Sequence, residues 1–216
     1  MTQEMITYYA QRAAEYERVY SGPRWQDDLA RLKARIPELF AGRRVYEVAC
    51  GTGYWTRVAA EHAATVHATD VNDDTLALAR AKAYRAPVSF ERRDAYASAM
   101  GPARFDAGLA ALWLSHVDLD RLDAFFRALH SHLAPGSPVL MFDERQRAER
   151  EARVPASRTD GTGNRYEMRQ LQSGERYEIV KNFFDPDDLA RRLAPDATDV
   201  AYRELAYFWI LEYQTR

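Results

Sequence analysis

Two glycines and a following acid, set between short β-prone runs, are the residues of this chain best suited to bind a ligand. The run 45–48 leads into a turn containing Gly51 and Gly53, and the next β-prone run, 65–70, ends on Asp70. Such a turn needs glycine, because a residue without Cβ lets the backbone bend sharply and lets a ligand approach closely. Asp70 follows Gly51 by 19 positions, where a carboxylate can accept hydrogen bonds from both hydroxyls of a ribose. The spacing predicts a nucleoside site.

The turn also resembles a known motif. A dinucleotide-binding turn has a third glycine where this chain has Thr56, which weakens an NAD or FAD interpretation. The segment resembles motif I of class I S-adenosylmethionine-dependent methyltransferases, in which an acid is followed by three glycines at alternate positions. Glu47, Gly51 and Gly53 match it, and Ala49 replaces the first glycine. Because alanine is the smallest departure, the turn is expected to survive with a slightly fuller inner wall.

The order of later segments supports the same resemblance. Asp94 follows the β-prone run 88–93, and a fourth strand begins near Phe105. The match extends over about residues 43–143. Four ordered elements at family spacing are a far more specific signal than two glycines and an acid.

The resemblance implies S-adenosyl-L-methionine as cofactor and assigns expected contacts. Glu47 would hold its methionine part and Asp70 its ribose. Val71 would pack against the adenine, and Asp94 with Ala95 would recognise the adenine amino group. The expected cofactor site is completed by Tyr8, Tyr16, Ala49, Gly51, Thr52, Gly53, Trp55 and Ala111.

Several of these residues have a competing structural explanation. Asp70 could cap the helix expected from residue 73, and Asp94 could cap a short helix at 95–99. In related small-molecule methyltransferases a tyrosine of the N-terminal helix often lies over the cofactor as a lid, where its ring face also suits the sulfonium cation. By this resemblance, Tyr8 and Tyr16 would form such a lid here. They could equally belong to a packing stripe.

His116 is the titratable side chain best placed for catalysis. It follows the expected fourth strand, and open α/β sheets bind ligands beyond the carboxyl ends of their strands. With an ordinary pKa near 6.5, a histidine there could remove a proton from an attacking hydroxyl or nitrogen. The alternative is that His116 only hydrogen-bonds a loop.

The hydrophobic pattern predicts an α/β fold. Strands at 44–48, 65–70, 88–92, 105–112 and 138–143 alternate with helices at 54–62, 73–84 and 118–133. This alternation favours a Rossmann-like, doubly wound and mostly parallel sheet. The expected architecture is seven-stranded with an antiparallel last strand, two N-terminal helices and an inserted β-hairpin.

The chain is expected to form one domain with four parts. Residues 1–42 would be a helical lid and 43–143 the cofactor-binding core. Residues 144–184 would form a variable, acceptor-side segment, irregular up to 164 and then a hairpin at 165–171 and 176–182. Residues 185–216 would close the fold, with Asp185 capping a helix before two strands.

Composition narrows the function. The 216 residues are 47% hydrophobic and carry 32 acidic against 30 basic side chains, so no overall field attracts nucleic acid or anionic lipid. A single cysteine favours a reducing cytoplasm, because it cannot form an internal disulfide. No metal is expected. No apolar run is long enough to predict a membrane span, and secretion is not suggested. The chain is expected to be a monomer or homodimer.

The sequence therefore predicts methyl transfer from S-adenosyl-L-methionine to an oxygen or nitrogen of a small organic molecule. A protein or RNA acceptor is the alternative within the family. Nucleic-acid base methyltransferases commonly carry Asn or Asp, then Pro-Pro and an aromatic, after the fourth strand, where this chain has residues 112–115 as Leu-Trp-Leu-Ser. A non-catalytic nucleoside-binding module or a dehydrogenase is the alternative outside it.

Overall fold

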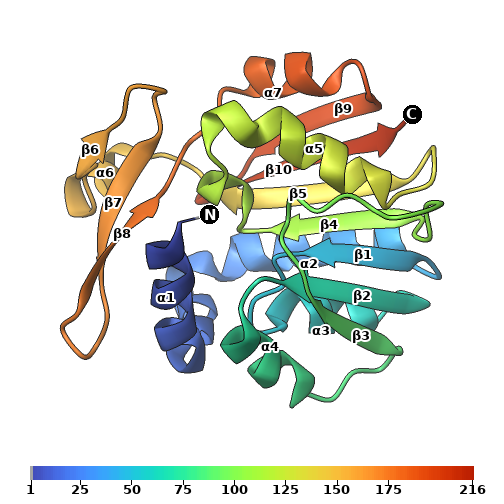
Figure 1. Ribbon diagram of the computed structural model, residues 1–216, viewed down its shortest axis with the longest axis horizontal. Coiled ribbons are helices and arrows are strands. Elements are labelled where there is room, and N and C mark those ends of the chain that lie inside the picture. The colour runs from blue at the N-terminus through green and yellow to red at the C-terminus, as the bar shows by residue number, and fades with distance from the viewer. Residues whose placement is uncertain (1) are drawn as a thin grey trace.

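A seven-stranded sheet forms the centre of the molecule (Figure 1). The computed structural model describes residues 2–216. The strands of this sheet are β1 (Arg44–Val48), β2 (Thr65–Asp70), β3 (Val88–Arg92), β4 (Ala107–Ala111), β5 (Pro138–Glu144), β9 (Ala197–Glu204) and β10 (Phe208–Thr215). Their order is β3-β2-β1-β4-β5-β10-β9, with β10 antiparallel to β5 and β9. The predicted doubly wound sheet with an antiparallel last strand is confirmed.

The strand order reverses beside β1, which has β2 on one side and β4 on the other. In register, Val45 of β1 lies opposite Val66 of β2 and Ala107 of β4. Open α/β sheets bind ligands at such a switch point, beyond the carboxyl ends of the strands. The glycine turn follows β1 at that end.

Helices cover both faces of the sheet and bury two cores. The helices α2 (Gln26–Phe40), α3 (Tyr54–Ala60) and α4 (Asp73–Arg80) pack on one face, and α5 (Leu122–Ser131) and α7 (Pro186–Leu193) on the other. Because strand side chains alternate, Val45 joins the first core whereas Tyr46 and Val48 join the second. The predicted cap of α7 is confirmed, since the Asp185 side chain accepts a hydrogen bond from the Asp188 amide.

The N-terminal segment begins with α1 (Gln3–Arg12), whose first turn is capped by the Thr2 side chain. It continues as 3-10 turns, η1 (Ala13–Ser21) and η2 (Pro23–Trp25), before α2. Figure 1 shows α1 beside the hairpin strand β8 (Arg176–Val180), at the edge of the central sheet. The N-terminal segment therefore bridges the hairpin and the carboxyl ends of the strands.

A second, three-stranded sheet lies apart from the first. It consists of β6 (Arg158–Thr159), β7 (Arg165–Gln170) and β8, so the predicted hairpin is confirmed. The prediction of irregular structure over 144–164 is partly wrong, because helix α6 (Ala148–Arg153) forms there. Arg150 of α6 is buried and pairs with the buried Glu167 of β7. An ion pair rather than an apolar stripe holds this helix, so hydrophobic periodicity does not reveal it.

Candidate functional site

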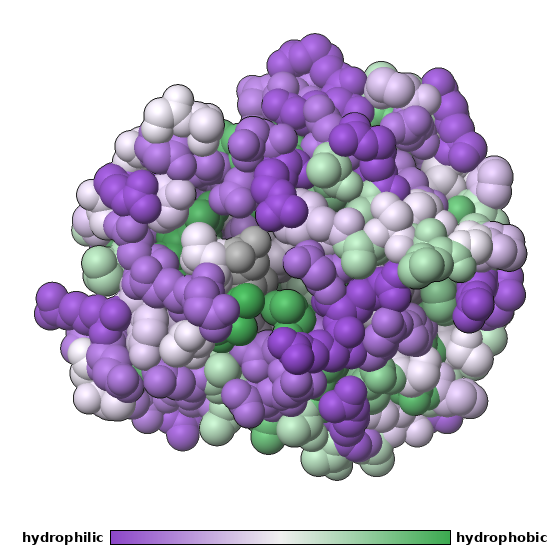
Figure 2. Space-filling model, in the orientation of Figure 1, coloured by the Kyte–Doolittle hydropathy of each residue, from purple (hydrophilic) through white to green (hydrophobic). Residues whose placement is uncertain are grey.

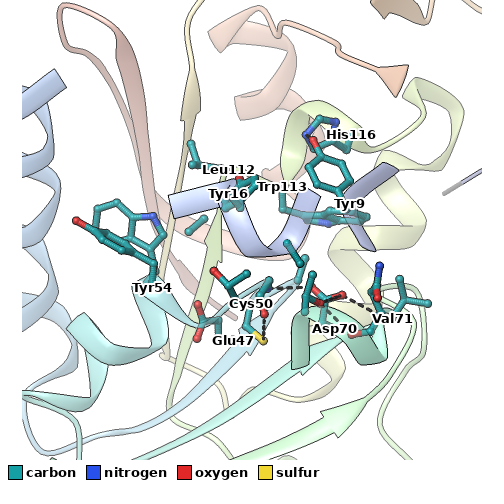
Figure 3. A pocket seen from close by; sticks show the side chains of 18 of the residues that line it. Tyr9, Tyr16, Glu47, Cys50, Tyr54, Asp70, Val71, Leu112, Trp113 and His116 are labelled. Atoms are coloured by element: carbon teal, nitrogen blue, oxygen red, sulfur yellow. Dashed lines mark hydrogen bonds between the residues drawn. The ribbon is translucent and has the colours of Figure 1, made fainter. Parts of the chain in front are cut away.

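A cavity lies at the carboxyl ends of the central strands, beneath the N-terminal segment (Figure 3). Figure 2 shows that this side of the molecule is mainly hydrophilic, with hydrophobic side chains visible where the surface is hollowed beside α1. Most residues that the sequence assigns to the site line the cavity: Tyr16, Glu47, Ala49, Gly51, Thr52, Trp55, Asp70, Val71, Ala111 and His116.

The turn after β1 adopts the conformation that its glycines suggest. Gly51 and Gly53 have φ angles of 55° and 82°, and Ala49 has 53°. The turn thus survives at Ala49, although a left-handed conformation costs an alanine about 1–2 kcal/mol. Gly53 itself does not line the cavity. A Cβ there would lie 2.6 Å from the Tyr84 hydroxyl oxygen, so Gly53 allows the turn to pack closely against its neighbours.

Asp70 connects the glycine turn to the start of α4. Its carboxylate accepts hydrogen bonds from the amides of Gly51 and Asn72, both at 2.9 Å, and from the Thr75 hydroxyl at 3.2 Å. The cap of α4 is Asn72, whose side chain accepts from the Asp74 amide, so Asp70 is not the helix cap. Burial raises the pKa of Asp70, and the backbone hydrogen bonds oppose that shift.

Glu47 is the most deeply buried acid of the cavity, with 1% of its surface exposed. Its Oε2 atom has no hydrogen-bond partner within residues 2–216. Burial raises the pKa of Glu47 to about 8, and the nearby Thr56 hydroxyl acts in the opposite direction. A buried carboxyl oxygen without a donor is costly, so this atom is suited to a ligand that supplies an N–H.

Asp94 and Ala95 lie in an adjoining hollow, which shares Ala49, Asp70 and Val71 with the main cavity. The amide of Tyr96 donates to the Asp94 carboxylate at 2.9 Å. That bond closes a turn, and the helix considered at 95–99 does not form. The two residues extend the site beyond Val71.

Tyr8 does not line the cavity, and its place is taken by the next residue, Tyr9. The Tyr8 ring packs with Leu171, Ile179 and Val180, because this face of α1 docks on the hairpin. Successive helical residues point about 100° apart, so Tyr9 faces the site instead. The sequence contained this signal, since Tyr9 belongs to the helical stripe that continues through Ala13, Tyr16 and Tyr20, all of which line the cavity.

His116 lies at the cavity wall, but both of its ring nitrogens already have partners. Nδ1 is 2.7 Å from the carbonyl oxygen of Val180, and Nε2 is 2.8 Å from the hydroxyl oxygen of Tyr9. Burial, with the nearby Lys181 cation, lowers the pKa of His116 to about 4. The predicted general base is therefore a neutral side chain whose second ring nitrogen, Nε2, is already engaged with Tyr9.

A second, basic lobe continues from the first. It shares Tyr9, Tyr16, Tyr20, Leu112 and His116 with the cofactor-side cavity. Its basic residues are Arg12, Arg24, Arg153, Arg169 and Lys181, against the two acids Asp143 and Glu144. We call it the cationic lobe.

Lys181 and Arg169 are the best-defined cations of this lobe. The Lys181 ammonium lies 2.9 Å from an Asp143 carboxylate oxygen and 2.8 Å from the Ser115 hydroxyl oxygen. Arg169 donates to Glu167 at 2.7 Å, while its buried Nε has no partner among the residues described. Both cations are held in place with donor capacity to spare.

Comparison with known proteins agrees with this geometry. A family model described as a methyltransferase domain matches residues 45–136. The structure of a DhpI–SAH complex is 28% identical, with 99% of this chain and 96% of that chain covered and a TM-score of 0.76. A DhpI–SAM–HEP complex is 29% identical, with 98% and 96% covered and a TM-score of 0.77. This chain is a class I S-adenosylmethionine-dependent methyltransferase.

Other matches bear on the fold alone. The 1,6-didemethyltoxoflavin-N1-methyltransferase of Burkholderia thailandensis is 18% identical, with 98% of this chain and 87% of that chain covered and a TM-score of 0.61. No curated protein matches the chain in sequence.

The methyltransferase uses S-adenosyl-L-methionine as cofactor, and the cavity suits it. Besides Glu47, the indole Nε1 of Trp113 is buried at the cavity wall without a partner among residues 2–216.

Two kinds of feature are absent from residues 2–216. No helix there combines the length and the apolar character needed to cross a membrane. Nor do three or more His, Cys, Asp or Glu side chains of this part of the chain gather in a way that could hold a metal ion.

Proposed function

We propose that this methyltransferase methylates an oxygen of a small, negatively charged organic molecule bound in the cationic lobe. The observation that carries the proposal is that the cofactor-side cavity and the cationic lobe share a wall. Tyr9, Tyr16 and His116 border both the cavity that contains the family's cofactor motif and the lobe with five basic side chains. An acceptor held by those cations would lie next to the cofactor.

The first cavity contains the groups that would hold the cofactor. Glu47 would accept a hydrogen bond from the ammonium group of its methionine part, and Asp70 would accept from the ribose hydroxyls. Val71 and Ala95 would contact the adenine, and Asp94 its amino group. Bound S-adenosylmethionine supplies a methyl group on a positively charged sulfur, so its leaving group is already activated.

The protein then contributes alignment and exclusion of water. Residues 2–42 would act as the lid, because α1 and η1 cover the cavity and are fixed there by side chains. The Glu17 carboxylate of η1 accepts from the Thr52 hydroxyl at 2.7 Å and pairs with Lys82. Asn72 donates to the carbonyl oxygen of Ile6 at 2.9 Å. Residues 144–184 would form the acceptor-side wall, since they supply Arg169 and Lys181.

An anionic acceptor also fits the way in which His116 and Lys181 are engaged by other side chains. A carboxylate or phosphate-type oxygen is already deprotonated near neutral pH, so it can attack the methyl carbon directly. The lone pair of His116 is engaged with Tyr9, and Lys181 is paired with Asp143. Charge-assisted hydrogen bonds from Lys181 and Arg169 would orient the attacking oxygen.

A labelled-cofactor assay tests the proposal with small carboxylates and phosphate or phosphonate monoesters, against neutral phenols, amines, a peptide mixture and RNA. We expect methylation of small anions. Arg169→Gln should lower kcat/KM by about one to two orders of magnitude, the effect of one charge-assisted hydrogen bond, with S-adenosylhomocysteine affinity unchanged. Arg191→Gln, on the exposed side of α7, is the matched control. Turnover of a neutral or macromolecular acceptor alone would overturn the proposal.

A further inference from the structure

Tyr9 and His116 form a hydrogen-bonded pair on the border between the cofactor cavity and the cationic lobe. We infer that the Tyr9 hydroxyl oxygen contacts the methyl group that is transferred, and that His116 is the positioning residue that orients this hydroxyl. The inference rests on the proposed function for the acceptor's place in the cationic lobe. It gives His116 a role other than that of a base.

The hydrogen bonds fix the direction of each proton. The carbonyl oxygen of Val180 can only accept, so His116 Nδ1, 2.7 Å away, carries the hydrogen and donates it. A neutral imidazole then has its lone pair on Nε2. The Tyr9 hydroxyl, 2.8 Å from Nε2, must donate to it. The single proton of Tyr9 is thereby used, and its oxygen offers only lone pairs to the cavity.

The surroundings keep both groups in these protonation states. The charged groups facing His116 are Lys181 and Arg169, which disfavour an imidazolium, and Asp143, which favours one. Burial and the Lys181 charge dominate, and the lowered pKa of His116 leaves the ring neutral across the physiological range. Burial also raises the pKa of Tyr9 well above its ordinary value, with Tyr16 and Tyr8 adding to the shift and Arg169 and Arg12 opposing it. The phenol keeps its proton.

An oxygen limited to accepting has a specific use beside a sulfonium. The positive charge on sulfur polarises the C–H bonds of the methyl group, so a lone pair can stabilise it through C–H···O contacts. The same oxygen cannot donate to an acceptor anion, which leaves that anion to Arg169 and Lys181. The ring of Tyr16, packed edge-on to Tyr9 with centroids 6.1 Å apart, limits where the phenol can move. The pair would hold the methyl on line with the cationic lobe.

Calorimetric binding of S-adenosylmethionine and S-adenosylhomocysteine tests the inference without turnover, because only the first carries the methyl group and the positive charge. Tyr9→Phe should weaken binding of S-adenosylmethionine about two- to fivefold relative to S-adenosylhomocysteine, the effect of one C–H···O contact. His116→Phe should shift the ratio in the same direction, because it frees the Tyr9 hydroxyl to rotate. His116→Gln, whose side-chain oxygen can accept from Tyr9, should restore part of the ratio.

Tyr8→Phe is the matched control, since Tyr8 is the adjacent tyrosine and lies outside the cavity. It should leave the affinity ratio unchanged. Retained binding of S-adenosylhomocysteine shows that each variant is folded. An unchanged ratio in Tyr9→Phe, or equal weakening of both ligands, would overturn the methyl contact and leave Tyr9 as a lid residue. If His116→Gln instead removes an ionisation from the rate–pH profile and leaves the ratio unchanged, His116 is a base and the inference fails.

The acceptor panel and the affinity ratio test two different ideas, and either idea can fail without the other. The panel reports which molecules are methylated, whereas the ratio reports contact with the cofactor's methyl group in the absence of any acceptor. A neutral acceptor would overturn the proposed function and leave the ratio measurement standing. An unchanged ratio would remove Tyr9 from the methyl group and leave the anionic acceptor in place.

Discussion

Cofactor binding should release a proton from Glu47. The side chain is 1% exposed, and burial raises its pKa to about 8. At pH 7 the carboxyl group of the free protein is then about 90% protonated, one pH unit below its pKa. Pairing with the ammonium group of the cofactor favours the carboxylate. We therefore expect release of about 0.9 proton per cofactor bound at pH 7.

The same shift makes the stability of the free protein depend on pH. The pKa of Glu47 in the folded state lies above its ordinary value of 4.5. Between those two values the folded state holds more protons than the unfolded state, so stability falls as pH rises from about 4.5 to 8. A shift of this size corresponds to a few kcal/mol, on the order of 1.4 per pH unit. Glu47→Gln should remove the loss and be more stable than wild type at pH 8.

Calorimetric titration with S-adenosylhomocysteine in buffers of different ionisation enthalpy measures the proton release directly. The observed enthalpy should vary linearly with the buffer's ionisation enthalpy, and the slope gives the number of protons. Glu47→Gln should reduce the slope to near zero, whereas Glu61→Gln, an exposed acid, should keep it. Equal enthalpies in all buffers would refute the reasoning. Release that persists in Glu47→Gln would assign the proton to another group, such as Asp70, whose pKa is also raised.

Three further predictions concern the cofactor turn and the hairpin. Asp70→Ala should weaken S-adenosylhomocysteine binding by about one to two orders of magnitude, measured by calorimetry, and unchanged affinity would remove Asp70 from the site. Gly53→Ala should lower the free energy of unfolding in urea by about 2–4 kcal/mol, because the new Cβ would sit on a left-handed backbone and overlap Tyr84, whereas Gly51→Ala meets no such overlap and should lower it by about 1–2 kcal/mol. Equal losses would contradict the packing explanation. Glu167→Gln should lose about 3 kcal/mol, because it leaves the buried Arg150 without its main partner, and an unchanged unfolding midpoint would show that the pair is dispensable.

The sequence predicts the sheet and the cofactor side of the site because both depend on local patterns. Alternating short apolar runs and helical stripes determine a doubly wound sheet. Strand ends in such a sheet meet at one edge, so Glu47, Asp70, Ala111 and His116 are brought together as expected. Their placement follows from topology rather than from any side-chain detail.

The remaining features depend on contacts between distant residues. His116 is held by Val180, 64 positions later, and by Tyr9, 107 positions earlier, so its occupied lone pair leaves no trace in local sequence. The choice of Tyr9 over Tyr8 depends on which face of α1 docks on β8. The cationic lobe brings together Arg12 and Lys181, which are far apart in the chain, so their meeting cannot be read from local sequence.

The two lobes differ in charge in a way that bears on turnover. In the cofactor-side cavity the acids Glu47 and Asp70 suit a cofactor that carries positive charge. In the cationic lobe Arg169 and Lys181 suit an anionic acceptor. Methyl transfer removes the positive charge from sulfur and one negative charge from the acceptor at the same moment. The attraction of the sulfur to nearby lone pairs and of the acceptor to the cationic lobe therefore weakens together. We expect the methylated product to inhibit much more weakly than the acceptor binds, since it forfeits one charge-assisted contact, and steady-state product inhibition measures this directly.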